Sequence, residues 1–377
     1  MNASLLCIPA VLASLAACGS SGSVAATAPL APDAPDASSA SATSTSTCSP
    51  PPVIATAPGE FATSLAVAGD TLYWTAVESD GGGVVWRAPK CTGAPRIALA
   101  RGRTRPASIV VDGARVAWID DLATVSSVSV DGGTVATIAE YPSDASIWST
   151  VTSLAAQGGQ LYWTGVRRGC DGAANCPGYD PYVATSPSTG GTEPRDLFVG
   201  LPTGSWSNLV VDASGITVVQ QPGSPPQASP PALLRIPLAG GTPTVLDAAP
   251  PTGFYGSVLV ACGGQICWCG EGLDDAGYVM SILRVATGAA PQLATLPAAD
   301  RPFQRNFLTM DGDRVYFTEG NFDTYVPPPL LLRSIKTDGT DLRTLAKAKA
   351  MEGWAAIAFD ALSVYVGASD GIYVLAK

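Results

Sequence analysis

Apolar residues recur along the chain in short alternating runs, separated by turns that contain glycine and aspartate. In the clearest unit, strands are expected at 108–111, 116–119, 124–130 and 134–139, with turns at 112–115 and 131–133. Short alternating runs rich in valine, isoleucine and threonine are typical of half-buried strands, and glycine and aspartate tolerate the positive φ of tight hairpins. The pattern therefore predicts a unit of four antiparallel strands.

This four-stranded unit occurs seven times between residues 65 and 377. An apolar residue of its first strand recurs at spacings of 44 to 55 residues, as Leu65, Ile109, Leu154, Leu209, Val258, Leu308 and Ile357. Four strands in a period of about 40–50 residues are typical of propeller blades. The sequence predicts an all-β, seven-bladed β-propeller over residues 50–377. Six blades are the alternative, if the copy around 216–219 is an insertion.

The seventh unit supplies only three strands before Lys377. The missing fourth strand is expected at 53–57, because that segment resembles the fourth strand at 134–138 and precedes the first unit. If it pairs with residues 371–375, the first and last blades are joined and an exposed sheet edge is removed. We therefore expect the N-terminal strand to close the ring.

Two of the second strands read Tyr-Trp-Thr, at 73–75 and 162–164, and Gly-Gly or Asp-Gly turns recur between the third and fourth strands. These motifs resemble the YWTD-type propellers of low-density-lipoprotein-receptor-like proteins and the TolB-like propellers of bacterial envelopes, over about residues 53–377. The resemblance implies the fold but no ligand site. Those families usually have six blades, and Ala76 and Gly165 stand where the receptor repeats have aspartate.

The N-terminal residues differ from the repeats. The apolar run at 5–17 is too short to span a bilayer and is typical of a signal peptide. The sequence Leu-Ala-Ala-Cys-Gly at 15–19 resembles the bacterial lipoprotein box. This resemblance implies a signal peptide over 1–17, lipidation of Cys18 and, because Gly19 is not aspartate, an outer-membrane lipoprotein. An ordinary secretory signal is the alternative, and both imply export to the cell envelope.

Residues 18–49 are mostly serine, alanine, threonine and proline, so they are expected to form a disordered tether. Only 14% of the chain is charged and its net charge is -10, which argues against nucleic acid because that binding depends on basic residues. The expected partner is a protein, peptide or glycan of the cell envelope. The oligomeric state is left open.

Seven cysteines follow Cys18, and disulfides persist in exported proteins. The expected disulfides are Cys170 with Cys176, Cys48 with Cys91, and Cys262 with either Cys267 or Cys269. One thiol of the last group is then left over. No metal site is predicted, because the chain has no histidine and this cysteine spacing suits tetrahedral ligation poorly.

The absence of histidine also excludes Ser-His-Asp and Cys-His nucleophiles and the commonest general base. No phosphate-binding loop occurs, since the glycines at 81–83 are expected at a hairpin tip. Adjacent Asp120 and Asp121 are expected to point apart. The turn aspartates, Asp112, Asp212, Asp311 and Asp360, are expected to be structural. We therefore expect neither an enzyme nor a cofactor.

The connections after the second strands vary most, at 165–181, 220–231, 270–277 and 319–329. They are expected on the same face as the links into the first strands. These links carry the large residues Phe61, Arg105, Trp148, Trp206, Phe254, Tyr255, Arg305 and Trp354. Because first strands line the central channel, these residues are expected around its mouth. They either wedge between blades or form an exposed platform for a ligand.

The leading hypothesis is a non-enzymatic, envelope-anchored binding or scaffold propeller that uses this long-loop face. The alternative is a metal-dependent lactonase or hydrolase with Ca²⁺ or another hard cation at the channel mouth. Its candidate oxygen ligands are Glu60, Asn208, Asp300 and Asn306. A third hypothesis, a structural surface coat protein, predicts no exposed aromatic cluster and no discrete pocket.

Overall fold

The chain separates by its internal contacts into two units, Met1–Thr47 and Cys48–Lys377. The structure is a computed structural model that describes residues 53–54, 59–91, 94–141, 147–169, 180–200, 206–220, 232–247, 255–262, 265–274, 277–285, 292–296, 304–320, 330–338, 340–348, 356–368 and 371–377. All of these residues belong to the second unit. The predicted signal peptide, Cys18 and tether lie outside them.

Within these residues the second unit consists of seven four-stranded antiparallel sheets without helices. The first strands are β2 (Phe61–Ala68), β6 (Ala107–Asp112), β10 (Ile147–Gln157), β14 (Trp206–Asp212), β18 (Tyr255–Cys262), β22 (Gln304–Asp311) and β26 (Ala356–Phe359). The second strands are β3 (Thr71–Val77), β7 (Arg115–Asp120), β11 (Gln160–Gly169), β15 (Gly215–Gln220), β19 (Gln265–Asp274), β23 (Arg314–Gly320) and β27 (Ser363–Ala368).

The third strands are β4 (Gly82–Pro89), β8 (Thr124–Ser129), β12 (Asp180–Pro187), β16 (Ala232–Ile236), β20 (Gly277–Val285), β24 (Leu330–Lys336) and β28 (Gly371–Ala376). The fourth strands are β5 (Ile97–Thr104), β9 (Ala136–Glu140), β13 (Arg195–Val199), β17 (Thr244–Asp247), β21 (Gln292–Leu296), β25 (Arg343–Ala348) and, from the N-terminal side, β1 (Val53–Ile54). The prediction of an all-β fold made of repeated four-stranded units is confirmed.

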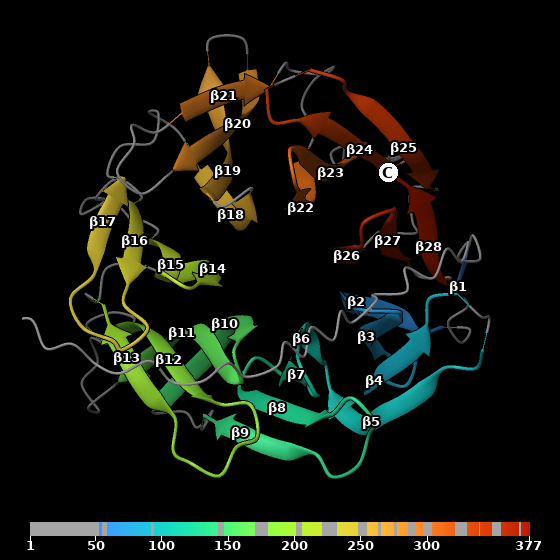
Figure 1. The fold of residues 1–377 in the computed structure, drawn as a ribbon, viewed down its shortest axis with the longest axis vertical. Helices are drawn as coiled ribbons and strands as arrows, with labels where there is room; N and C mark the ends of the chain where they lie inside the picture. Colours follow the sequence, from blue (N-terminus) through green and yellow to red (C-terminus); the bar gives the residue numbers. More distant parts are fainter. Residues whose placement is uncertain are drawn as a thin grey trace, which may run out of the picture. The chain divides into compact units, whose positions relative to one another are not determined.

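The sheets of the second unit follow one another in chain order, with first strands innermost and fourth strands outermost (Figure 1). Each first strand contacts the first strand of the next sheet, from β2 through to β26, and β26 contacts β2. The short strand β1 pairs with β28, with Val53 opposite Tyr373 and Ile54 opposite Ile372. The last sheet is thus assembled from both ends of this unit.

The hydrophobic core lies between the sheets. Each described cluster of buried residues joins two consecutive sheets, and one cluster joins the last sheet to the first, with Trp74 beside Tyr365 and Ile372. The centres of four second strands are fully buried tryptophans, Trp74, Trp118, Trp163 and Trp268. These indoles explain why the repeat is apolar and aromatic at its second strand, since each one fills the space between neighbouring sheets.

Two details of the sequence prediction are wrong. In the fifth unit Leu259, not Val258, lies opposite the buried Trp268. The loop expected at 270–277 is mostly strand, because β19 continues to Asp274 and pairs with β20 as far as Gly277. Alternating glycines in that segment hid a strand that cross-strand pairing stabilises.

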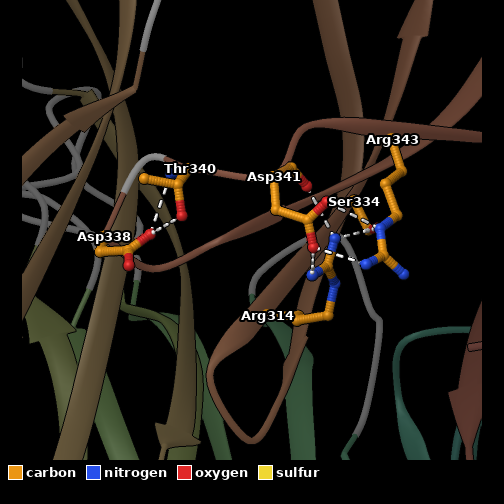
Figure 2. A network of polar contacts seen from close by, with 6 residues as sticks. All are labelled: Arg314, Ser334, Asp338, Thr340, Asp341 and Arg343. Carbon is orange, nitrogen blue, oxygen red and sulfur yellow. Dashed lines mark hydrogen bonds and ion pairs between the residues drawn. The ribbon is translucent and has the colours of Figure 1, made fainter.

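The turn between β24 and β25 shows how the hairpins are held (Figure 2). Asp338 accepts hydrogen bonds from the backbone N–H of Thr340 at 2.9 Å and from its hydroxyl at 2.6 Å. Asp341, which has a positive φ of 54°, accepts from Arg314 Nη1 at 2.7 Å and from Arg343 Nε at 2.9 Å. Two arginines therefore hold this residue in a conformation that side chains other than glycine rarely adopt.

Candidate functional site

The residues predicted around the channel mouth lie at the starts of first strands wherever the structure describes them. They are Phe61 in β2, Arg105 just before β6, Trp148 in β10, Trp206 in β14, Tyr255 in β18 and Arg305 in β22, with Phe254 and Trp354 outside the described residues. Among their side chains, that of Phe61 is half-buried and that of Arg105 is 70% exposed. The binding role of this set stays a prediction.

Strand pairing places these residues at different heights. Each of them pairs with a residue of the second strand that lies beyond the central apolar residue of that strand. The partner lies three positions beyond it for Phe61 and Tyr255, and two positions beyond it for Trp206 and Arg305. For Trp148 the partner lies five positions beyond it. Those central residues are Trp74, Trp163, Val218, Trp268 and Phe317. The backbone register therefore does not place these five residues at one common level. Spacing in sequence could not show this.

A β-bulge in the first strands explains part of this difference in height. Six first strands have a register shift near the central residue of the second strand, for example between Ala62 and Ser64 in β2 and between Val151 and Ser153 in β10. Bulges re-aim side chains at the rims of β structures. The extra residue in these two strands is a threonine, Thr63 or Thr152.

These threonines form a repeated polar link. The Thr63 hydroxyl lies 2.8 Å from that of Thr75, and the Thr152 hydroxyl lies 3.0 Å from that of Thr164. The next residue joins neighbouring sheets, since Ser64 accepts a 3.0 Å hydrogen bond from the backbone N–H of Ile109. Ser153 accepts in the same way from Leu209 at 3.3 Å. The repeated Thr-Ser-Leu and Tyr-Trp-Thr motifs were the sequence signal for this link, which the prediction missed.

The residue after Thr164 has no room for a side chain. A Cβ atom on Gly165 would lie 2.2 Å from the carbonyl oxygen of Thr150 and 2.5 Å from the Tyr182 ring. The equivalent Ala76 is fully buried. The aspartate of the receptor repeats therefore cannot occupy position 165 in this packing.

An ion-pair network fixes the end of the sheet β6–β9. Asp120 is 4% exposed and accepts hydrogen bonds from Trp118 Nε1 and Ser126 Oγ, both at 2.8 Å. Arg103, from the preceding sheet, donates Nε to both Asp120 oxygens at 3.1 and 3.2 Å. Such bidentate pairing compensates the burial of the carboxylate.

The neighbouring turn is strained and exposed. Arg105, Ser108, Asp121 and Leu122 are four of the five described non-glycine residues with positive φ, with values of 40° to 59°. Arg105 Nε donates to Asp121 at 2.9 Å, while the Leu122 side chain is 49% exposed. Asp120 and Asp121 thus point to different partners, as predicted. Such conformations persist only where surrounding contacts impose them, and they gather at functional sites.

Close packing supports this turn from the first sheet. A Cβ atom on Gly83 would lie 2.2 Å from Cδ of Pro106, so the link before β6 crosses directly over that glycine. Thr63 donates to the carbonyl oxygen of Pro106 at 2.6 Å. The glycines at 81–83 therefore belong to a hairpin. The last of them, Gly83, permits the close approach of the link that precedes β6.

Glu60, a predicted ligand of the metal-dependent alternative, is buried at 2% exposure and ion-paired with Arg96. The Arg96 guanidinium stacks 3.9 Å from the centre of the Trp86 ring. The side chains of Asn208 and Asn306, and Asp300 altogether, lie outside the described part. Among the described residues, no group of three or more acidic or cysteine side chains could hold a metal ion.

The turn aspartates contact neighbouring sheets or their own hairpins, as predicted. Asp112 accepts a hydrogen bond from the backbone N–H of Gly159, and Asp311 is ion-paired with Lys377. Burial would raise the pKa of Asp212, but hydrogen bonds from Ser214 and Arg235 lower it below its ordinary value. These carboxylates are therefore structural.

Cys91 and Cys267 each take part in a disulfide bond. Cys48, Cys170 and Cys176 lie outside the described residues, so the expected pairings stay predictions. No helix of the described part is both long enough and apolar enough to cross a membrane.

No protein-family description and no curated protein matches this sequence. Solved structures do match the fold. Oligogalacturonate lyase from Vibrio parahaemolyticus superposes with a TM-score of 0.60 at 11% identity, over 82% of this chain and 86% of that one. The acylaminoacyl peptidase of Pyrococcus horikoshii gives 0.59 at 12% identity, over 84% of this chain and 51% of that one. The WD40 β-propeller domain of Doa1 gives 0.52 at 11% identity, over 86% and 94%.

The chain has a β-propeller fold. The similar structures include enzymes and a WD40 propeller. Because propellers of unrelated function share one fold, these matches establish the architecture and leave function to the site.

Proposed function

We propose that the protein is a non-enzymatic binding or scaffold propeller, exported and anchored to the cell envelope through lipid on Cys18. Residues 1–17 would be the lipoprotein signal peptide and 18–49 the tether. The lipoprotein-like sequence at 15–19 supports the anchor. Replacing Cys18 with serine should move the protein from the membrane fraction to the soluble fraction and abolish incorporation of labelled palmitate.

We infer that the head is a closed seven-bladed ring. The contact of β26 with β2, the core cluster shared by the last and first sheets, and the pairing of β1 with β28 all support this closure. A closed ring leaves two faces for binding, one at the ends of the second strands and one at the turns that follow the first strands.

The binding face is the one at the ends of the second strands, and the strained turn of sheet β6–β9 carries this proposal. It presents the exposed Leu122 beside the Arg105–Asp121 ion pair, on a backbone fixed by hydrogen bonds from Asp121 N to Thr104 O at 2.8 Å and from Val151 N to Leu122 O at 2.6 Å. An exposed apolar side chain on a fixed backbone, with a charged rim, is typical of a protein or peptide contact.

Leu122→Ser tests this face, and Leu362→Ser is its matched control. Leu362 is 71% exposed but lies in the turn between β26 and β27, at the opposite ends of the strands. Peptide and glycan arrays probed with the labelled protein should show binding that Leu122→Ser weakens at least fivefold and Leu362→Ser leaves within twofold. Equal effects of both variants would exclude this face as the binding surface.

Trp206→Ala and Trp354→Ala test the predicted aromatic platform. We expect both to weaken array binding more than they lower the melting temperature. If they only unfold the protein, these indoles wedge between blades instead.

The metal-dependent hydrolase is the alternative, with Glu60, Asn208, Asp300 and Asn306 as its candidate ligands. The ion pair of Glu60 with Arg96 weighs against it. Metal analysis of the purified protein decides between the two, because one tightly bound cation per chain would favour the hydrolase.

A further inference from the structure

A cleft of about 650 Å³ separates the outer parts of the sheets β6–β9 and β10–β13. One wall is the end of β9 with Tyr141, and the other is the turn at 191–194 between β12 and β13, with Arg167 and Asp196. Figure 1 shows β9 and β13 as outer strands of consecutive sheets. The volume is within the roughly 300–1,000 Å³ that ligand pockets occupy. This cleft adjoins the strained turn proposed above, since Tyr141 N donates to Ala123 O at 3.0 Å, but its lining residues are not those of the turn.

The positive charge in the cleft is already neutralised. Arg167 donates Nη1 and Nη2 to the two oxygens of Asp196 at 2.6 and 2.8 Å, and its guanidinium stacks 4.0 Å from the centre of the Tyr182 ring. Burial lowers the pKa of Arg167, but the hydrogen bonds and charge of Asp196 raise it above its ordinary value overall. Arg167 therefore remains charged, and its bidentate carboxylate partner satisfies it.

Besides Asp196, the lining of the cleft contains two further carboxylates. Glu140 and Glu193 are exposed and both line the cleft, one at the end of β9 and one on the turn at 191–194. Among the described residues neither takes part in an ion pair. The lining therefore carries a net charge of about minus two, which favours a cation over an anion.

The wall beneath these carboxylates is partly apolar. Half-buried Pro194 and Tyr141 line the cleft, whereas Ile138 and Ala139, which also border it, are core residues with only 4% exposure. An apolar wall below a pair of carboxylates suits a side chain with an aliphatic stem and a charged head, and lysine and arginine have this form. A neutral sugar would leave both carboxylates without a countercharge.

We propose that this cleft binds a lysine or arginine side chain of a peptide segment, with the stem against Tyr141 and Pro194 and the cation between Glu140 and Glu193. The lining of the cleft does not include Leu122, so variants of Glu140 and Glu193 test the cleft separately from the Leu122 turn.

Titration calorimetry of the whole protein with acetyl-trilysine amide tests the proposal. We expect saturable binding that weakens with added salt, and no binding of the same peptide with all three lysines acetylated, since acetylation removes the charge and keeps the stem. The double variant Glu140→Gln with Glu193→Gln should bind about fivefold more weakly, as expected for the loss of two partly exposed ion pairs.

The matched control is Asp70→Asn with Asp313→Asn, which removes the same two charges from exposed turns of other sheets. Circular dichroism and melting temperature establish that each variant is folded. If the control weakens trilysine as much as the glutamate variant does, the binding is attraction to the net negative charge and the proposal is wrong. It is also wrong if the glutamate variant binds as well as the wild type, or if a neutral oligosaccharide displaces trilysine. Loss of array binding by Leu122→Ser has no bearing on this result.

Discussion

The ion pair between Lys90 and Asp360 joins the first sheet to the last across 270 residues of sequence. Its Nζ–Oδ2 distance is 2.8 Å, and the two side chains are 11% and 19% exposed. Asp360 also accepts hydrogen bonds from the backbone N–H groups of Leu362 and Ser363 and from the hydroxyl of Tyr365, at 2.8 to 2.9 Å. Replacing Asp360 with asparagine removes the charge and keeps an acceptor oxygen for the turn.

The size of the effect follows from the pKa. Burial would raise the pKa of Asp360, but the bonds from Lys90, Leu362, Tyr365 and Ser363 outweigh it and lower the pKa from 3.8 to about 2. That fall corresponds to at most about 2.5 kcal/mol at neutral pH. Since about a fifth of the carboxylate side chain is exposed, solvent screening reduces the expected contribution to about 1 kcal/mol.

The sign of the pH dependence is fixed. Because the folded pKa is lower than the unfolded one, the stabilisation is complete above about pH 4 and is lost as the pH falls to about 2. Urea unfolding followed by tryptophan fluorescence should show Asp360→Asn less stable than wild type by about 1 kcal/mol at pH 6. The difference should disappear near pH 2.

Asp313→Asn is the control for this experiment, because Asp313 is exposed in a turn of another sheet. It should change the free energy of unfolding by less than about 0.5 kcal/mol at either pH. A stability difference for Asp360→Asn that is the same at pH 2 and pH 6 would refute the reasoning, since the loss would then come from the turn and not from the charge.

Three further variants test the packing. Gly165→Ala should cost about 1–3 kcal/mol in urea unfolding, because the new Cβ would meet the Thr150 carbonyl and the Tyr182 ring, and an unchanged midpoint would contradict this crowding. Asp341→Ala should lower the melting temperature, because it removes the acceptor shared by two arginines at a strained position, whereas Asp341→Gly should restore part of the loss. Cys91→Ser should destabilise the protein by about 2–4 kcal/mol, and a dithiol reductant, which also reduces the disulfide of Cys267, should lower the wild-type midpoint at least as far as this substitution does.

The repeat was readable in the sequence because strand periodicity and turn chemistry are local properties. Alternating apolar residues, the Tyr-Trp-Thr strands and the glycine or aspartate turns predicted four-stranded units, and the structure confirms them. Similarity of the N-terminal segment to an ordinary fourth strand also pointed to β1, which pairs with β28. These features depend on residues that are close in the chain.

The positions of residues at the strand ends could not be predicted from local sequence patterns. The bulge at Thr63 and the longer β10 shift the predicted mouth residues to different heights, and a shift by one residue moves a side chain to the other face. The strained turn at Leu122 carries no glycine, so nothing local marked it.

The sequence by itself determined what each unit is, because hydrogen bonding within a hairpin and apolar alternation are written in consecutive residues. Only the tertiary structure decided what lies between units. The crowding at Gly165, the bond from Lys90 to Asp360 and the cleft beside Glu140 and Glu193 all depend on the separation of neighbouring sheets. That separation is set by how buried side chains from two sheets fill a shared volume, which no single stretch of sequence specifies.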